Sequence, residues 1–257
     1  MKQQWLERYE RILEWVKKAG DEQVKRMDQP LKIEQKSANI DLVTEMDVWT
    51  DEFFQENIQQ HFPDDAILSE ETGVSKGNSG FEWVVDPIDG TTNYAHRFPL
   101  FSISVAVKYK GETVIGVVYA PKLGECYTAI KGEGAYLNQE KIVVSKRTEL
   151  TESVIATGFP YDRATDSLNN VEQFNSVILH VGGIRRTGSA ALDLCQVAAG
   201  RFEGYWEYKI NPWDFEAGVL IVEEAGGAIL KKQLEKGFFV LAGNEEVLNQ
   251  IRMLIKE

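Results

Sequence analysis

The sequence predicts an α+β protein in which helices are layered against strand-rich blocks. Three observations lead to this prediction. Apolar residues recur at helical spacing near both ends of the chain, the pattern turns into β-branched and aromatic runs between about residues 81 and 130, and Gly or Pro separates these runs. No repeat or low-complexity segment interrupts the 257 residues, so we expect a single domain, 1–257, with an N-terminal half (about 1–150) and a C-terminal half (about 151–257).

Composition excludes several classes of protein. The chain has 28 basic and 40 acidic side chains, a formal net charge of −12, and no basic stripe, which disfavours nucleic-acid binding. Its apolar stretches, such as 217–222, are too short to span a membrane, and the N-terminus lacks the apolar core of a signal peptide. Two cysteines make no disulfide framework. We expect a cytoplasmic protein with no membrane partner. Its acidic side chains either form a well-hydrated surface or lie close together and bind divalent cations.

Two helices and a short ribbon are expected in the first 60 residues. The first helix should cover 5–19 and end at Gly20, and the second should run from about 45 to 60, before Pro63. Between them, 30–40 is typical of a loop or short ribbon. The side chains predicted to face inward are Leu6, Tyr9, Leu13 and Val16 in the first helix and Met46, Trp49 and Phe53 in the second.

Strands and helices are expected in the rest of the chain. Val, Ile and aromatic runs predict strands at 81–85, 101–109, 114–119, 125–130, 153–157, 183–187, 202–208 and 238–242. Helical spacing predicts helices near 168–180, 189–199, 213–225 and 244–255. We expect Ser189 to cap its helix at the N-terminus and Gly200 to end it.

The most informative stretch is Trp-Val-Val-Asp-Pro-Ile-Asp-Gly-Thr-Thr-Asn-Tyr, residues 83–94. A strand ends in Asp86 and Asp89, Gly90 permits a tight turn, and Thr91 can begin a helix whose free N–H groups suit a phosphate. Carboxylates beside a phosphate would repel it unless cations lay between them, which points to Mg²⁺. An isolated Asp-Gly would more often be only a β-turn, but the whole stretch is far more specific.

A rival motif fails at the same place. Haloacid-dehalogenase-type phosphatases carry Asp-x-Asp-Gly-Thr with a nucleophilic aspartate, whereas Pro87 and Ile88 separate the two carboxylates here.

Three other stretches contain acidic residues that could be functional, and each of these residues could instead have a purely structural role. Asp214 (in 211–227) and Asp47 (in 41–47) could be helix caps, and Glu70 (in 67–72) could be a solvated loop residue.

Together the four stretches resemble the inositol monophosphatase family of Mg²⁺-dependent, lithium-sensitive sugar phosphatases. The likeness runs from Lys36 to Gly227. It implies a layered α-β-α-β-α sandwich and a phosphomonoesterase that hydrolyses inositol 1-phosphate, or a similar small phosphorylated substrate, by direct attack of metal-activated water. It also implies a homodimer.

The resemblance implies roles for individual residues. The first Mg²⁺ would be held by Glu70, Asp86, the Ile88 carbonyl and the Thr91 hydroxyl, the second by Asp86, Asp89 and Asp214, and a weaker third by Glu70. Lys36 lies in a segment that forms a mobile loop in the family. Ser69 stands where the family often has Gly.

Phosphate and substrate contacts follow from the same resemblance. The N–H groups of Gly90 and Thr91 would bind the phosphate, and Asp47 would hydrogen-bond Thr91 and help polarise the attacking water, so that Asp47, Glu70 and Thr91 are the catalytic set. The other expected substrate contacts are Asp89, Ala190 and Glu207. The histidines, His61, His96 and His180, are expected to be structural, because none forms a metal-like pair.

Substrate identity stays open. Arg185 and Arg186 either bind a second phosphate, as in fructose 1,6-bisphosphate or NADP, or form a surface or dimer-interface ion pair. The alternatives to an inositol monophosphatase are a broad-specificity fructose-1,6-bisphosphatase/NADP phosphatase and a regulator of RNA polymerase or ribosomal RNA processing that retains the fold.

Overall fold

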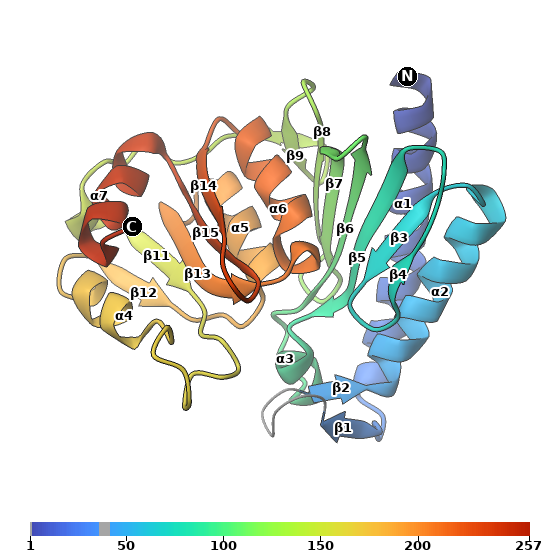
Figure 1. Ribbon diagram of the computed structural model, residues 1–257, viewed down its shortest axis with the longest axis horizontal. Coiled ribbons are helices and arrows are strands. Elements are labelled where there is room, and N and C mark those ends of the chain that lie inside the picture. Colours follow the sequence, from blue (N-terminus) through green and yellow to red (C-terminus); the bar gives the residue numbers. More distant parts are fainter. Residues whose placement is uncertain (1, 36–41) are drawn as a thin grey trace.

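The computed structural model describes residues 2–35 and 42–257, so Lys36 and Asp41 lie outside the described residues (Figure 1). The helices are α1 (Lys2–Met27), α2 (Glu45–His61), α3 (Thr91–Ala95), α4 (Val171–Ile178), α5 (Ala190–Ala198), α6 (Pro212–Glu224) and α7 (Glu245–Ile255), with a short 3₁₀ turn at Leu150–Glu152. None of these helices has the length and apolar character needed to cross a bilayer.

One layer is an eight-stranded sheet in the order β10-β9-β8-β7-β6-β5-β3-β4. Its neighbouring strands are antiparallel except β3 and β5, which are parallel. The bounds are β3 (Ala66–Ser69), β4 (Gly73–Ser75), β5 (Phe81–Asp89), β6 (Ser102–Tyr109), β7 (Glu112–Ala120), β8 (Glu125–Ile130), β9 (Ala135–Leu137) and β10 (Glu140–Ile142).

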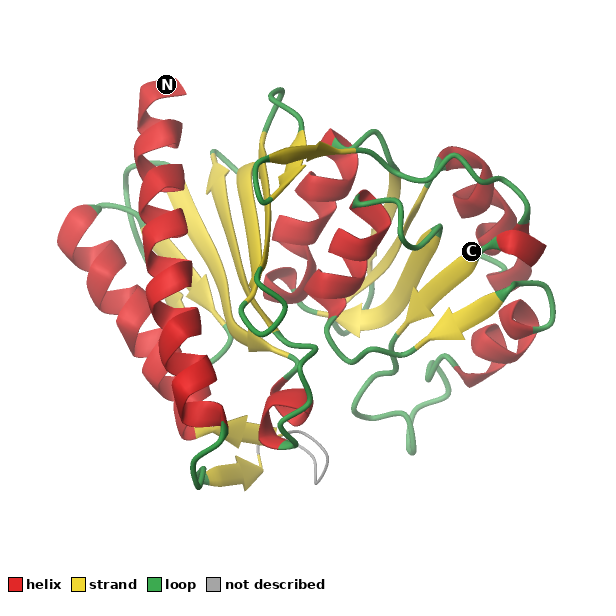
Figure 2. Ribbon diagram, turned by 180° about the vertical axis from the view of Figure 1, so that it is seen from behind, coloured by secondary structure: helices red, strands yellow, loops and turns green. Residues whose placement is uncertain are grey.

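The second layer of strands has the order β12-β11-β13-β15-β14. Its bounds are β11 (Val154–Thr157), β12 (Gly183–Arg185), β13 (Gly204–Ile210), β14 (Ala228–Gln233) and β15 (Phe238–Gly243), and β1 (Ile33–Gln35) pairs with β2 (Leu42–Thr44) as a separate ribbon. Helices α1 and α2 cover the outer face of the first sheet, α5 and α6 lie between the sheets, and α4 and α7 cover the second (Figures 1 and 2). The predicted α-β-α-β-α sandwich is therefore confirmed.

The first helix is longer than predicted because Gly20 does not end it. A Cβ at Gly20 would lie 2.6 Å from Cε1 of Tyr119 and 2.9 Å from Cβ of Pro121, so this glycine lets α1 approach the end of β7 closely. Of the predicted inward residues, Val16 is buried and Tyr9 and Leu13 pack against the core, whereas Leu6 is 43% exposed. Ile12 and Trp15, which were not predicted to face inward, are buried. Glycine within a helix costs about 1 kcal/mol relative to alanine. The close packing of α1 against β7, which has no room for a Cβ, outweighs that cost here.

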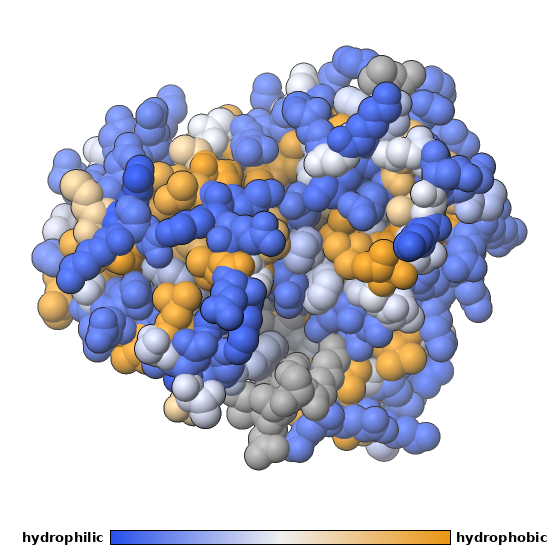
Figure 3. All heavy atoms as spheres, in the orientation of Figure 1, coloured by the Kyte–Doolittle hydropathy of each residue, from blue (hydrophilic) through white to orange (hydrophobic). Residues whose placement is uncertain are grey.

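Other predicted elements need smaller corrections. Trp49 is 37% exposed and stacks on Phe53 instead of entering the core. The short strands β3, β4, β9, β10 and β14 were not predicted. In β14, Lys231 and Lys232 lie on a half-exposed strand, where burial supplies no alternating apolar signal. On the face drawn in Figure 3, hydrophilic side chains predominate and apolar groups form separate patches.

Close packing also fixes α6 against the first sheet. A Cβ at Gly116 in β7 would lie 2.6 Å from the carbonyl oxygen of Ala217 in α6. Since backbone atoms of the two elements nearly touch, the helix cannot shift on the sheet without breaking this contact. Its N-terminal end therefore lies at a fixed position beside β5.

Candidate functional site

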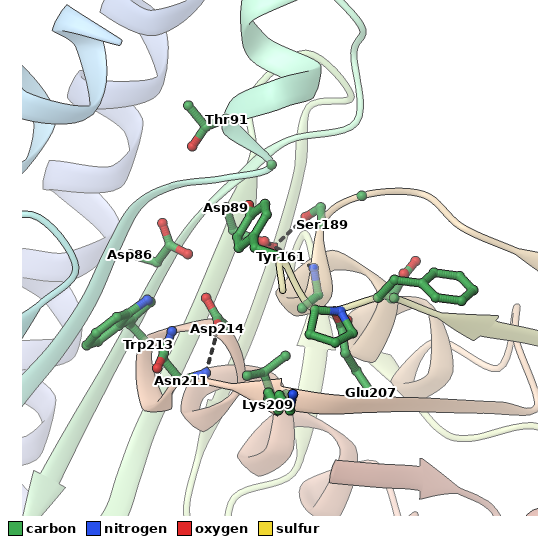
Figure 4. A pocket seen from close by; sticks show the side chains of 18 of the residues that line it. Asp86, Asp89, Thr91, Tyr161, Ser189, Glu207, Lys209, Asn211, Trp213 and Asp214 are labelled. Carbon is green, nitrogen blue, oxygen red and sulfur yellow. Dashed lines mark hydrogen bonds between the residues drawn. The ribbon is translucent and has the colours of Figure 1, made fainter. Parts of the chain in front are cut away.

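A pocket of about 120 Å³ opens where the end of β5 meets β13 and the N-terminal ends of α5 and α6 (Figure 4). Its acidic and hydroxyl lining includes side chains from distant parts of the sequence: Glu70, Asp86, Asp89, Thr91, Ser189, Asp193, Glu207 and Asp214. Ile88, Gly90, Ala190 and Arg186 line it too. The structure thus brings together most of the predicted site residues.

The two aspartates of the first motif are aimed by an irregularity in β5. The strand does not end at residue 85, as predicted, but continues to Asp89, and its pairing with β6 shifts register between Asp86 and Asp89. The carbonyl of Pro87 within this bulge accepts a hydrogen bond of 2.9 Å from Nε2 of Gln23. Bulges redirect side chains in this way, so both carboxylates can face the pocket.

The turn after β5 requires glycine. Gly90 has φ 98°, and a Cβ there would lie 3.1 Å from the carbonyl oxygen of Gly188. Both the left-handed backbone and the close approach exclude larger residues. The turn leads directly into α3, which begins at Thr91 as predicted.

Asp47 both caps α2 and contacts Thr91. Its Oδ2 accepts hydrogen bonds from the backbone N–H of Thr44 (2.8 Å) and the Thr44 hydroxyl (2.6 Å), which confirms the capping alternative. Its Oδ1 lies 2.9 Å from the Thr91 hydroxyl, which confirms the predicted Asp47–Thr91 contact. Burial raises the pKa of Asp47 to about 6, although these hydrogen bonds oppose the rise.

Asp89 caps α5 from a different element. Its carboxylate accepts hydrogen bonds from the hydroxyl of Ser189 (2.5 Å) and from the backbone N–H groups of Ala190 (3.0 Å) and Ala191 (2.8 Å). Ser189 is the N-cap residue of α5, as predicted, but its hydroxyl makes no capping hydrogen bond because it donates to Asp89 instead. The Ala190 N–H, in the residue predicted to contact substrate, is likewise occupied by this carboxylate.

Asp214 lies where it can serve in both of the ways considered for it, as a helix cap and as a metal ligand. Its Oδ2 accepts a 2.6 Å hydrogen bond from the backbone N–H of Asn211, so it belongs to the capping box of α6, and it also lines the pocket. Burial raises its pKa, and the charge of Glu70 raises it further. For Asp86, burial and then the charges of Glu70, Asp89 and Asp214 raise the pKa in the same way. These carboxylates are close enough to repel one another.

The chemistry of this donor set fits divalent cations. Hard cations such as Mg²⁺ prefer carboxylate, hydroxyl and carbonyl oxygens, and no Lys or Arg in 2–35 or 42–257 pairs with Asp86, Asp89 or Asp214. No three His, Cys, Asp or Glu side chains among those same residues are already arranged to hold an ion. The donors therefore match the predicted metal in kind, while binding would require the carboxylates to turn toward a common centre.

Glu207 forms the opposite wall of the pocket on β13. The Tyr205 hydroxyl donates a 2.8 Å hydrogen bond to its Oε2, and a Cβ at Gly158 would overlap its carboxylate. Burial raises the pKa of Glu207 to about 7, against the lowering effects of Tyr205 and Arg186. The predicted substrate contact is thus a carboxyl group that titrates near neutral pH.

The adjacent arginines separate in the structure. Arg186 lines the pocket, whereas Arg185 is exposed, lies outside it and donates from its guanidinium to the carbonyl of Ile184 (3.1 Å). Of the two alternatives considered for the arginines, a second-phosphate contact would need Arg185 at the pocket, and its side chain lies outside; a surface role remains for it. Sequence reasoning missed Asp193 and Lys209, which also line the pocket.

The Ser69 difference also has a structural account. Ser69 is buried, and its hydroxyl donates to the Asp51 carboxylate and lies 3.3 Å from the carbonyl oxygen of Val85. These contacts tie the end of β3 to α2 and β5. Glu70, the next residue, is therefore anchored on the pocket side without a glycine before it.

Comparison with known proteins agrees with this architecture. Residues 5–255 match the sequence model of the inositol monophosphatase family. The chain is 41% identical to the Nus factor SuhB of Pasteurella multocida, covering 86% of each chain, and 42% identical to the inositol-1-monophosphatase of Synechocystis, covering 88% of this chain and 78% of that protein. The solved structure of a Thermotoga maritima IMPase superposes with a TM-score of 0.88 at 33% identity, covering 97% of each chain.

Proposed function

Because this chain belongs to the inositol monophosphatase family, we propose that it is a Mg²⁺-dependent phosphomonoesterase acting on inositol 1-phosphate or a similar small phosphate monoester. One observation supports this most: Glu70, Asp86, Asp89 and Asp214, spread over the sequence, line one pocket together with Thr91. Placing two buried and two partly buried carboxylates in one pocket costs stability unless cations offset their charge, which is typical of a functional site.

The metal-binding set would be Glu70, Asp86, Asp89, Asp214, the Ile88 carbonyl and the Thr91 hydroxyl. When bound, two or three Mg²⁺ ions would offset the negative charge of the carboxylates and polarise the phosphorus–oxygen bonds of the substrate. Asp89 also contributes without metal, since its hydrogen bonds hold the start of α5 against the pocket. Asp214 does the same for α6.

Thr91 and Asp47 would act on the attacking water. The Thr91 hydroxyl directs its proton to Oδ1 of Asp47 or to the carbonyl of Ile88 (3.1 Å), so its oxygen can accept a hydrogen bond from a water in the pocket. A carboxyl group with a pKa of about 6 at Asp47 can take up a proton at Oδ1 near neutral pH. No side chain needs to form a bond to phosphorus.

Glu207 would orient the alcohol part of the substrate. Its carboxylate faces the pocket from β13, and Tyr205 holds one oxygen. The other oxygen can accept a hydrogen bond from a sugar or inositol hydroxyl. This contact would select polyols but would not by itself choose among them.

Phosphate release from a panel of monoesters tests the proposal. Inositol 1-phosphate should be hydrolysed with Mg²⁺ and not with EDTA, and activity should nearly vanish in Asp86→Asn. The matched control is Asp64→Asn, which changes an exposed aspartate and should keep activity. No release from any monoester with Mg²⁺, or equal release in EDTA, would contradict the proposal.

A second candidate function has one specific observation in its favour. Several relatives at about this identity are named Nus factor SuhB, including those of Pasteurella multocida (41%) and Haemophilus influenzae (40%). We therefore keep a role in regulating RNA polymerase or ribosomal RNA processing as the alternative. Binding to RNA polymerase that survives Asp86→Asn, in a chain that hydrolyses no monoester, would favour it. The homodimer and lithium inhibition also stay proposals, testable by light scattering and by assays with LiCl.

A further inference from the structure

One buried side chain of α1 contacts the proposed metal-binding motif from outside the pocket. Gln23 continues the inward face of α1 formed by Val16 and Ala19, and it is completely buried without lining the pocket. Glutamine is rarely buried so fully, and buried amides are almost always hydrogen-bonded. Its partners therefore indicate why a polar residue lies on the apolar face of this helix.

The amide nitrogen of Gln23 donates to two other elements. Its Nε2 lies 2.9 Å from the carbonyl oxygen of Pro87 in the bulge of β5 and 3.1 Å from the hydroxyl oxygen of Thr50 in α2. Pro87 and Thr50 are themselves buried. Because Pro87 lies in the stretch of β5 that is paired with no residue of β6 or β3, Gln23 supplies a contact there that regular strand pairing does not.

The backbone of Gln23 contacts the other end of the motif. The hydroxyl of Tyr94, a buried residue of α3, donates a 2.8 Å hydrogen bond to the Gln23 carbonyl oxygen. Pro87 precedes the turn at Gly90 and Tyr94 follows it, so α1 is attached to the chain on both sides of this turn. Figures 1 and 2 show the C-terminal end of α1 close to α3.

The peptide between Pro87 and Ile88 links this contact to Asp86. Gln23 binds the carbonyl oxygen of that peptide, and its N–H, which belongs to Ile88, donates a 3.0 Å hydrogen bond to Oδ1 of Asp86. Since a peptide unit is planar, the direction of its carbonyl also fixes the direction of its N–H. The Gln23 amide therefore controls, through one rigid peptide, where the Asp86 carboxylate lies.

The oxygen of the Gln23 amide shows that the residue does not simply fill space. Oε1 is buried and accepts no hydrogen bond within residues 2–35 and 42–257. An amide that leaves a buried oxygen unpaired is less favourable than an apolar side chain of similar size. Exchanging the nitrogen and oxygen of the amide would bring Oε1 against the carbonyl oxygen of Pro87, which has no proton to donate. The donor function of Nε2 therefore accounts for a glutamine at this position.

We propose that Gln23 is a positioning residue for the metal site: by holding the peptide between Pro87 and Ile88, it orients the Asp86 carboxylate and thereby raises the affinity of the pocket for Mg²⁺. Thr50 has a supporting part, because its hydroxyl fixes the amide that contacts Pro87. Gln23 itself touches neither cation nor substrate. The inference rests on the proposed function and adds to it a residue that lies outside the pocket.

Isothermal titration of the full chain with Mg²⁺ tests this role. Gln23→Met keeps the length and the apolar part of the side chain but removes the donor. It should weaken Mg²⁺ binding about tenfold, the lower end of the effect usual for residues that orient metal ligands. Thr50→Val, which is similar in shape and leaves Gln23 in place, should cause a smaller loss, and it serves as the test if Gln23→Met does not fold.

Ile12→Val is the matched control. Ile12 is as fully buried in α1 as Gln23, but it belongs to a different apolar cluster from Ile88 and Tyr94. Shortening this side chain should lower the stability of the fold without changing the affinity for Mg²⁺.

Activity gives a second readout that a merely structural role would not move. With inositol 1-phosphate, the Mg²⁺ concentration for half-maximal rate should rise about tenfold in Gln23→Met, whereas kcat at saturating Mg²⁺ should change little. Loss of stability alone would leave the Mg²⁺ dependence as it is in the wild type. If Mg²⁺ binds but no monoester is hydrolysed, the proposed function fails, while the titration still decides the positioning role.

Amide hydrogen exchange, followed by NMR in EDTA, tests the positioning without any cation. The Ile88 N–H should exchange faster in Gln23→Met than in wild type or Ile12→Val, because its peptide is then held from one side only. Three results would each overturn the positioning role, even in an active phosphatase: an Mg²⁺ affinity that Gln23→Met leaves unchanged, an equal loss of affinity in Ile12→Val, or unchanged exchange at Ile88. A wild type that binds no Mg²⁺ would overturn the proposed function as well.

Discussion

Glu207 should make the stability of this protein depend on pH between about 4.5 and 7. Burial raises the pKa of its carboxyl from the ordinary value of 4.5 to about 7 in the folded chain. Each pH unit between the two values corresponds to about 1.4 kcal/mol, so the charged form costs the fold up to about 3.5 kcal/mol. Because Glu207 is half-buried at the pocket wall, solvent screening lowers this, and we expect about 1–3 kcal/mol.

The sign follows from linkage. The folded state binds the Glu207 proton more tightly than the unfolded state does. The contribution of Glu207 to the free energy of unfolding is therefore most favourable below about pH 4.5, falls as the pH rises, and levels off above about pH 7. Glu207→Gln carries no charge and lacks this decrease, while its amide oxygen can still accept from Tyr205. Relative to wild type, the variant should therefore gain about 1–3 kcal/mol between pH 5 and 8.

Urea unfolding in EDTA at pH 5, 6, 7 and 8 measures this difference. EDTA removes cations that would otherwise stabilise the pocket carboxylates. Glu235→Gln is the control, because Glu235 is exposed and its variant should follow the wild-type curve. If the free energies of unfolding of Glu207→Gln and wild type run parallel across this range, the carboxyl is solvated and our account of the pocket wall is wrong.

Three further outcomes test the site and the packing. Asp86→Asn should weaken both Mg²⁺ sites, whereas Asp214→Asn should spare the first one and still lose most turnover; isothermal titration that counts the same ions in an active Asp214→Asn would make Asp214 a helix cap alone. A single turnover in ¹⁸O-water should place one label in the released phosphate, and a trapped phospho-aspartate would refute direct attack by water. Gly116→Ala should destabilise the fold by about 1–3 kcal/mol in urea, because its Cβ would lie 2.6 Å from the Ala217 carbonyl oxygen; unchanged stability would show that α6 can move off β7.

Local pattern accounts for what could be predicted of the fold. Strands β6, β7 and β8 have apolar and β-branched runs that the alternation rule detects, and α2 begins at an acid-rich capping sequence. Short strands such as β9 and β10 could not be predicted from the sequence, because three residues are too few to show a periodic pattern. The end of α1 could not be predicted for another reason. Whether Gly20 ends the helix or lets it pack closely depends on Tyr119, 99 positions along the chain.

For the site, the sequence by itself determined which carboxylates are present and that Asp86, Asp89 and Gly90 lie at a strand end, since covalent spacing sets that local geometry. Only the tertiary structure decided that Asp89 caps a helix 100 residues away, that Arg186 and not Arg185 enters the pocket, and that Lys209 engages Asp162. These outcomes depend on strand register and on which surfaces pack together. Such contacts join residues with no fixed spacing in the chain, so local periodicity carries no information about them.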